Sequence, residues 1–257
     1  MEGELDFHGK TMLVTGSGRN IGRAIILEFA ERGANVVINA RSNVEEARSV
    51  EKEAKAFGAA TAVVMGDAAE LSTIEELKSV AEERFGTVDM YVSNAARRLY
   101  KDFFETTNED WHQYLNQQLT ASWYLAKAFV PGMQAAGWGR IIHMNGPDGW
   151  TGGWLRAPHS TAKGGLHTLT KSLAAGLGQF GITVNDVDPG HTETIRDVET
   201  HPNVTREHDI ELAARIAARK LPQPEDIAWA VAYLCSPRSN TLTGSVIHID
   251  GGRDMLG

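Results

Sequence analysis

The chain has 257 residues, of which 42% are hydrophobic and 23% are charged, and these shares exclude a disordered or fibrous protein. Its formal net charge of −8 argues against nucleic acid or an anionic membrane surface as the main partner. The single cysteine, Cys235, excludes an internal disulfide framework and suits a reducing compartment. The first ten residues lack an apolar segment, and no apolar run reaches ~18 residues, so we expect a cytoplasmic protein without a secretory signal or a membrane span.

Short apolar runs alternate with helix-length amphipathic segments along the whole chain. The predicted strands cover residues 11–14, 35–39, 62–65, 88–92, 140–144, 183–187 and 245–249. The predicted helices cover residues 21–32, 44–57, 71–85, 108–136 (with one break), 161–180 and 224–235. Apolar strands separated by helices indicate an α/β protein: a single doubly wound domain over residues 1–257, with a mostly parallel sheet of about seven strands and helices on both faces. Residues 191–222 form a long irregular stretch with a weak helix at 208–220, and we expect a mobile substrate loop there.

A glycine-rich segment, TGSGRNIG, joins the first predicted strand to the first predicted helix. Gly16, Gly18 and Gly22 lack a Cβ, so the backbone can turn sharply there and approach a pyrophosphate closely. The amides at the start of the helix then face the phosphates. This placement predicts a Rossmann-type dinucleotide site. Its phosphate-side residues are Gly16, Ser17, Gly18, Arg19, Asn20 and Ile21.

The residues after the second predicted strand bear on which dinucleotide binds. A site that prefers NAD usually places an acidic residue there to hold the ribose 2′-hydroxyl group. This chain has Asn39-Ala40-Arg41-Ser42 instead, with Arg19 in the glycine-rich segment. Two guanidinium groups without a carboxylate suit a 2′-phosphate, so we expect NADP(H) to be preferred over NAD(H). Asp67, followed by Ala68, is placed to accept a hydrogen bond from the adenine amino group, or else caps the next helix.

With these motifs the chain resembles the short-chain dehydrogenase/reductase superfamily over essentially its whole length. Besides TGSGRNIG, it has Ser93-Asn94-Ala95-Ala96, Val184-Asn185 followed by Pro189-Gly190, and TGSVIHIDGG at residues 243–252. The resemblance implies further cofactor-binding residues: Asn94, Ala95, Lys163, Pro189, Gly190, Thr192 and Thr194. It also implies a homo-oligomer, a dimer or tetramer, formed through the helices around residues 122–136 and 161–180.

The chain departs from this family at the catalytic positions. Usual members place a tyrosine and a lysine four residues apart on one helix, with a serine that binds the substrate oxygen and an asparagine that anchors a water. Here the lysine is Lys163, whereas His159 stands at the tyrosine position and Gly146 at the serine position. Gln118 stands at the asparagine position, with Asn116 two residues earlier. We take His159, Lys163, Gln118 and Asn145 as the catalytic candidates.

His159 has two interpretations. Imidazole exchanges protons near neutral pH, so it could act as a base in alcohol oxidation or as a weak donor to a carbonyl group. Alternatively it is a polar pocket residue without a chemical role. Gly146 provides no donor for a substrate oxygen; Asn145, Gln118 or Ser160 could supply one. Ribose binding alone would account for Lys163.

The substrate pocket is predicted around Gly146, Asp148, Trp154 and His191. Trp150 and Arg156 lie on the same glycine-rich segment, and Arg97, Arg98 and Tyr100 follow the fourth predicted strand. Aromatic walls with an arginine suit a ring-bearing or acidic substrate. His201, Glu207 and His208 lack the spacing of metal ligands, so we predict no metal.

Three functions remain open. The first is a divergent NADP(H)-dependent oxidoreductase that acts on a carbonyl/alcohol pair, with His159 in place of tyrosine. The second is a redox-neutral lyase, dehydratase or isomerase that uses His159 with His191 or Asp148. The third is a non-catalytic NADP-binding protein, because a fold alone does not fix a function.

Overall fold

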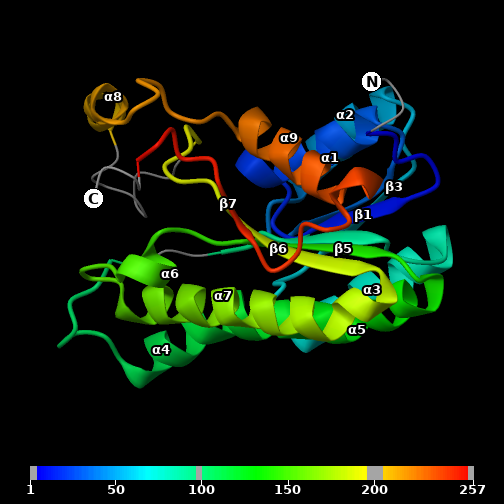
Figure 1. Cartoon of the computed structure of the whole chain (residues 1–257), viewed down its shortest axis with the longest axis horizontal. Helices are drawn as coiled ribbons and strands as arrows, with labels where there is room; N and C mark the ends of the chain where they lie inside the picture. Colours follow the sequence, from blue (N-terminus) through cyan, green and yellow to red (C-terminus); the bar gives the residue numbers. More distant parts are fainter. Residues whose placement is uncertain (1–4, 97–99, 196–204, 254–257) are drawn as a thin grey trace.

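The computed structural model describes residues 5–96, 100–195 and 205–253, which form one seven-stranded parallel sheet with helices on both faces (Figure 1). The strand order is β3–β2–β1–β4–β5–β6–β7. The strands are β1 (Thr11–Val14), β2 (Asn35–Ala40), β3 (Thr61–Met65), β4 (Met90–Ser93), β5 (Gly139–Met144), β6 (Ile182–Asp188) and β7 (Val246–His248). The chain builds outward from β1 to β3 and then returns to β4, so its topological switch point lies between β1 and β4. The predicted doubly wound Rossmann fold is confirmed.

The helices divide between the two faces of the sheet as the alternating side chains of the strands require. The α-helices are α1 (Asn20–Glu31), α2 (Val44–Ala56), α3 (Leu71–Phe85), α4 (Asn108–Leu115), α5 (Ala121–Ala136), α6 (Asp148–Thr151), α7 (Ala157–Leu177), α8 (Arg206–Arg215) and α9 (Pro224–Cys235). Figure 1 shows α1, α2 and α9 on one face and α3, α5 and α7 on the other. On β2, Val36 and Ile38 pack with the first group, whereas Val37 between them packs with the second.

The long helix expected over residues 108–136 is interrupted as predicted, and the interruption is a π-helical turn. This turn, η1 (Asn116–Thr120), joins α4 to α5 and contains Gln118. Such turns widen a helix by one residue and occur frequently at functional sites. The position of the break could not be read from periodicity, because the apolar face continues on both sides of it.

Several predicted boundaries are wrong by a few residues. β4 begins at Met90 rather than 88, and α7 begins at Ala157 rather than 161 because Pro158 favours the first turn of a helix. α8 covers Arg206–Arg215 instead of 208–220, because Thr205 caps it through a hydrogen bond from the His208 amide. The short helix α6 was not predicted, since four residues are too few to show a helical period.

Within the described part of the chain, no helix combines the length and the apolar character that crossing a membrane requires.

Candidate active site

The carboxyl ends of the strands meet at one end of the molecule, where α6, the start of α7 and α8 also lie (Figure 1). In doubly wound sheets this edge, at the switch point, is where ligands bind. The sequence motifs singled out above follow β1, β4, β5 and β6, so the fold gathers them at this edge.

The glycine-rich turn between β1 and α1 forms a cradle that side chains would fill. Gly16 has a φ of +63°, and a Cβ at Gly22 would lie 2.5 Å from the carbonyl oxygen of Gly16. α1 itself has no side-chain cap and no acidic residue in its first turn, whereas α2, α4, α8 and α9 all have acidic residues there. An uncapped helix start behind a side-chain-free turn suits a phosphate group, so these residues fit a dinucleotide.

Two asparagine side chains hold the glycine-rich turn in place. Asn94, after β4, donates from Nδ2 to the carbonyl oxygens of Thr15 (2.9 Å) and Gly16 (3.1 Å). Asn39, the buried residue near the end of β2, accepts from the Gly16 amide at 3.2 Å and donates to the carbonyl oxygens of Val64 and Gly66. The sequence did not single out this role of Asn39, although a buried asparagine at a strand end was its signal.

The other residues predicted on the phosphate side differ in their surroundings. Ser17 is buried and donates to the Val14 carbonyl oxygen, so its hydroxyl group stabilises the turn. Asn20 pairs with the backbone of Ile195 through two hydrogen bonds, of 2.9 and 3.0 Å. Arg19 is exposed and lies 4.0 Å from the carboxylate of Glu46, which was not among the residues predicted at this site. Ile21 follows in the first turn of α1, and Arg41 is exposed after β2.

The remaining predicted cofactor residues lie after β3, β4 and β6. Asp67 accepts from the Ala69 amide at 3.0 Å, and Ala68 is buried. Ala95 packs against Gly16, where its Cα would lie 3.0 Å from an added Cβ. The turn after β6 is held by the Gly190 amide, which donates to Asp188, and by the Thr192 hydroxyl group, which donates to the Pro189 carbonyl oxygen. Thr194 is half-buried beyond this turn.

His159 lies in the first turn of α7, buried beside the carboxylate of Asp148. Its Nε2 atom is 3.6 Å from Asp148 Oδ2, an ion-pair distance rather than a hydrogen bond. The same Oδ2 atom accepts from Arg156 Nη1 at 2.6 Å. Arg156 in turn lies over the Tyr100 ring, 4.2 Å from its centre, and donates to the Tyr100 hydroxyl group. Asp148 is therefore oriented by an arginine and faces the imidazole.

Two glycines bring Asp148 to His159 by letting α6 lie directly on α7. A Cβ at Gly149 would lie 3.0 Å from the backbone carbon of Lys163, and one at Gly164 would lie 3.0 Å from the Gly149 carbonyl oxygen. Backbones this close leave no room for side chains between them. The pairing of Asp148 with His159 depends on this tertiary contact, which the sequence pattern did not reveal.

The other catalytic candidates differ in their burial and in their hydrogen-bond partners. Lys163, one turn later on α7, is buried and donates from Nζ to the Met144 carbonyl oxygen at 2.5 Å. Gln118 is buried within the π turn η1. The Asn145 side chain is directed elsewhere: Nδ2 donates to Asp186 at 3.0 Å, and Oδ1 accepts from the Gly146 amide. The Ser160 Oγ atom is buried and has no hydrogen-bond partner among the described residues.

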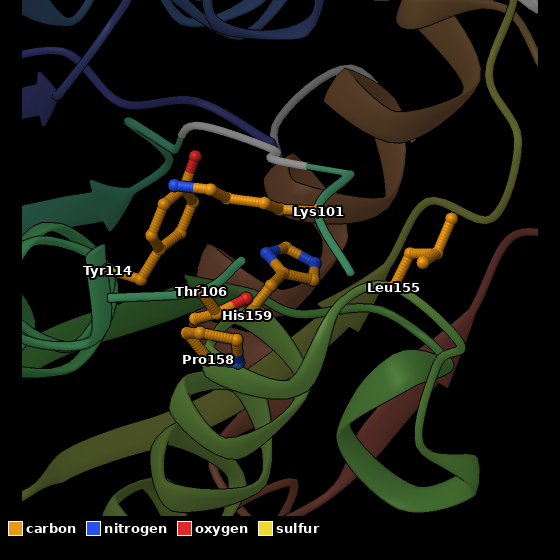
Figure 2. Close-up of a pocket in the computed structure, with 6 residues that line it drawn as sticks. All are labelled: Lys101, Thr106, Tyr114, Leu155, Pro158 and His159. Carbon is orange, nitrogen blue, oxygen red and sulfur yellow. The ribbon is translucent and has the colours of Figure 1, made fainter. Parts of the chain in front are cut away.

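His159 also lines a small pocket with residues from the segment before α4 (Figure 2). Figure 2 shows its ring between Tyr114 and Leu155, with Lys101, Thr106 and Pro158 around it. A Cβ at Gly146, the predicted position of the family's serine, would meet no described atom within 4 Å, so this position is sterically open. Trp154, predicted in the substrate pocket, is 86% exposed. Arg97, Arg98 and His201 lie outside the described residues.

A buried polar network connects β5, β6 and α7. Asp186 is fully buried and accepts from Thr170 Oγ1 at 2.6 Å and from Asn145, and it lies 2.8 Å from His167 Nδ1. His143, also fully buried, lies 4.0 Å from Asp186. Burial lowers the pKa of His143 from 6.5 to about 4, with Lys163 acting in the same direction and Asp186 against it. His143 is therefore neutral in the folded protein at pH 7.

His191 and His208, which are seventeen positions apart in the chain, lie together beside the carboxylate of Asp209. His191 Nε2 is 2.6 Å from Asp209 Oδ1, and His208 Nδ1 is 3.7 Å from the same oxygen. The sequence spacing grouped His208 only with His201 and Glu207, and it did not predict His191 and Asp209 as its neighbours. Spacing along the chain could not show this, because His191 follows β6 whereas His208 and Asp209 lie on α8.

Comparison with known proteins supplies independent relatives. A family model described as "Enoyl-(Acyl carrier protein) reductase" matches residues 16–254. A Thermotoga maritima protein named "Uncharacterized oxidoreductase" is 34% identical over 251 residues, which cover 96% of this chain and 98% of that protein. An L-rhamnose 1-dehydrogenase (NAD(P)(+)) of Azotobacter vinelandii is 33% identical over 248 residues, which cover 95% and 96%. The solved structure of an L-sorbose reductase from Gluconobacter frateurii, complexed with NADPH and L-sorbose, matches with a TM-score of 0.91 at 28% identity, covering 97% of this chain and 98% of that one.

Proposed function

The chain belongs to the short-chain dehydrogenase/reductase superfamily, and on that premise we propose that it is an NADP(H)-dependent oxidoreductase acting on a carbonyl/alcohol pair, with His159 in the role of the usual tyrosine. The observation that carries the proposal is the half-buried carboxylate of Asp148 beside buried His159, which lies one helical turn before Lys163. Beside an acid/base histidine, such an oriented carboxylate stabilises the imidazolium that forms when the ring takes up a proton.

The proton step follows from this arrangement. A nicotinamide cofactor held by the glycine-rich turn and Lys163 would supply the hydride chemistry that interconverts a carbonyl carbon and an alcohol carbon. In the oxidation direction, His159 accepts the proton from the alcohol oxygen, and Asp148 stabilises the resulting positive charge. In the reduction direction, the protonated ring returns that proton to the carbonyl oxygen. Arg156 holds the Asp148 carboxylate in place, since its Nη1 atom donates to Oδ2 at 2.6 Å.

The cofactor would lie along the edge from β3 to β6. The turn from Gly16 to Gly22 would hold the pyrophosphate, and Lys163 would hold the nicotinamide ribose. Arg41 and Arg19 stand where a 2′-phosphate of NADP would lie, and this supports NADP(H) over NAD(H). Arg41 supports this preference more strongly than Arg19 does, because the Glu46 carboxylate lies 4.0 Å from the Arg19 guanidinium group.

The substrate oxygen needs a donor besides His159, since Gly146 has no side chain. Ser160 supports this role best among the candidates: its buried hydroxyl group lies next to His159 in the chain and has no partner among the described residues. Asn145 is engaged by Asp186, and Gln118 is the remaining candidate. Relatives named for rhamnose and sorbose make polyhydroxylated carbonyl compounds the first substrates to test.

The test measures NADPH oxidation, and NADP⁺ reduction in the reverse direction, with a panel of sugars and sugar acids. We expect His159→Ala to lower kcat by about 10²–10⁴-fold, the usual contribution of a positioned acid/base group. Asp148→Asn should lower kcat by roughly 10-fold or more while leaving NADPH affinity unchanged, since it removes the charge that supports the imidazolium. NADPH fluorescence titration provides that affinity.

His112→Ala is the matched control, because His112 is exposed on α4 and away from the carboxylate of Asp148. Unchanged turnover in His159→Ala would exclude the acid/base role. Substrate conversion without consumption of NADPH would favour the redox-neutral alternative. NADPH binding with no conversion of any substrate in the panel would favour the non-catalytic one.

A further inference from the structure

A cluster outside the His159 group contains two imidazoles and a carboxylate from two separate parts of the fold. His191 follows β6, and His208 and Asp209 lie in the first turn of α8. One ligand atom from each of the three residues lies within 4.8 Å of the other two. The rings of His191 and His208 are 5.4 Å apart between centres and are tilted by 56° to each other.

The three groups match what a transition metal ion requires. A zinc ion binds imidazole nitrogens at about 2.0–2.1 Å and carboxylate oxygens at about 2.0–2.2 Å, so its ligand atoms lie about 3 Å apart. The 2.6 Å and 3.7 Å separations around Asp209 Oδ1 bracket that value, and small side-chain rotations would equalise them. Two imidazoles with one carboxylate suit zinc and its neighbours rather than magnesium or calcium, which prefer oxygen ligands.

The other histidine–aspartate pairs of the described chain do not offer this geometry. His8 pairs with Asp6 at an exposed site, and neither of them belongs to a group of three potential ligands. Asp186 has two imidazoles near it, but its oxygens already accept from Thr170 and Asn145 inside the core. At Asp209 the surroundings are more open: His191 is 11% exposed, Asp209 26% and His208 46%, so an ion can enter.

We propose that His191, His208 and Asp209 form a binding site for one divalent transition metal ion of the zinc class. The ion replaces the proton shared between His191 and Asp209 and joins the turn after β6 to the first turn of α8. Three protein ligands leave at least one coordination position open, as in metal sites that bind water or a small oxygen ligand. The site does not depend on the proposed hydride transfer, because none of its ligands belongs to the His159 group.

Isothermal titration calorimetry with ZnCl₂ tests the site on the full chain, prepared without a polyhistidine tag and without a nicotinamide cofactor. We expect one ion per chain and a rise in Tm on zinc addition. His208→Ala and Asp209→Asn should each weaken binding at least 10-fold and remove the rise in Tm, because each loses one of three ligands. Cobalt(II) substitution should give visible d–d absorption bands, which report nitrogen and oxygen coordination independently of catalysis.

His8→Ala is the matched control, since it removes an exposed imidazole that also pairs with an aspartate. It should bind zinc like the unmodified chain. Far-UV circular dichroism shows whether each variant is folded, and Asp209→Asn, which keeps the size of the side chain, provides a second test if His208→Ala unfolds α8. The absence of saturable zinc binding, or equal affinity in both ligand variants and the unmodified chain, would overturn the proposal.

Discussion

Gly146 is a single residue position at which the sequence predicts a departure from the family's usual site. The residue follows β5 at the predicted position of the family's serine, and the space that a Cβ would occupy is open. His159, Lys163 and Gly146 were assigned from their register against the family motifs alone. What the sequence could not supply is the environment of His159, because Asp148 and Arg156 reach it through the packing of α6 on α7.

The open space at Gly146 leads to a test at the residue scale. Gly146→Ser should fold with nearly unchanged stability, since its added atoms meet no described neighbour within 4 Å at the Cβ position. Combined with His159→Tyr, it restores the two usual hydroxyl groups above Lys163. We expect the double variant to reduce carbonyl substrates at least ~10²-fold faster than His159→Ala, which is the lower end of what a positioned acid/base group contributes. Steady-state NADPH oxidation measures this; equal rates would show that other parts of the site have also changed.

The elements of the fold could be predicted to different degrees, and the reason is physical. α3 has the predicted bounds because its apolar period ends at Gly86, whose φ of +80° a helix cannot continue. α6 could not be predicted, because it exists through its contact with α7 rather than through its own pattern. The π turn η1 and the convergence of β6 with α8 likewise depend on tertiary contacts.

The contact between α6 and α7 gives a prediction at the element scale. Gly149→Val would place its Cβ 3.0–3.1 Å from the backbone of Lys163, so α6 must move away and take Asp148 with it. We expect unfolding in urea to show a loss of about 1–3 kcal/mol, the usual cost of overpacking, together with a lower kcat. The matched control is Gly176→Ala on the same helix α7, where an added Cβ meets nothing within 4 Å. That variant should be stabilised by about 0.5–1 kcal/mol. Equal effects in the two variants would contradict the close packing of α6.

For the whole molecule, the pairing of buried charges and neutral groups sets how stability depends on pH. In the described core, burial lowers the pKa of His143 from the ordinary value of 6.5 to about 4. As pH falls from 6.5 toward 4, the unfolded chain binds this proton and the folded chain does not, so the free energy of unfolding decreases. The shift corresponds to about 3 kcal/mol.

The window in which this loss appears separates it from the carboxylates. Three charge-assisted or neutral hydrogen bonds, from Lys55, Arg48 and Thr61, lower the pKa of Glu51 to about 2, against the desolvation that raises it. Its contribution is therefore lost only below pH 4.5. Between pH 6.5 and 4.5 we expect urea midpoints to fall in the unmodified chain and to fall less in His143→Gln. His112→Gln, on the surface, should behave like the unmodified chain; the same slope in all three proteins would contradict the assignment to His143.

At the same scale, the sequence predicted the sheet, its coverage on both faces and the edge at which the motifs gather, because a parallel sheet is encoded in consecutive apolar runs. The oligomeric state stays a prediction, since the residues on the outer faces of α5 and α7 do not identify what packs against them.

The two hydrogen bonds between Asn20 and Ile195 have a thermodynamic consequence for the order of events at this edge. They tie the first residue of α1, behind the pyrophosphate cradle, to the segment that leads from His191 toward α8. Each bond contributes about 0.5–1.5 kcal/mol, so their free energy is enough to link occupancy on the two sides measurably. Such linkage is reciprocal. If an ordered segment raises the affinity of the glycine-rich turn for its ligand by some factor, occupancy of the turn raises the affinity of a ligand held by the segment by the same factor. We therefore expect the binding of the dinucleotide and the binding of the substrate to be thermodynamically coupled rather than independent.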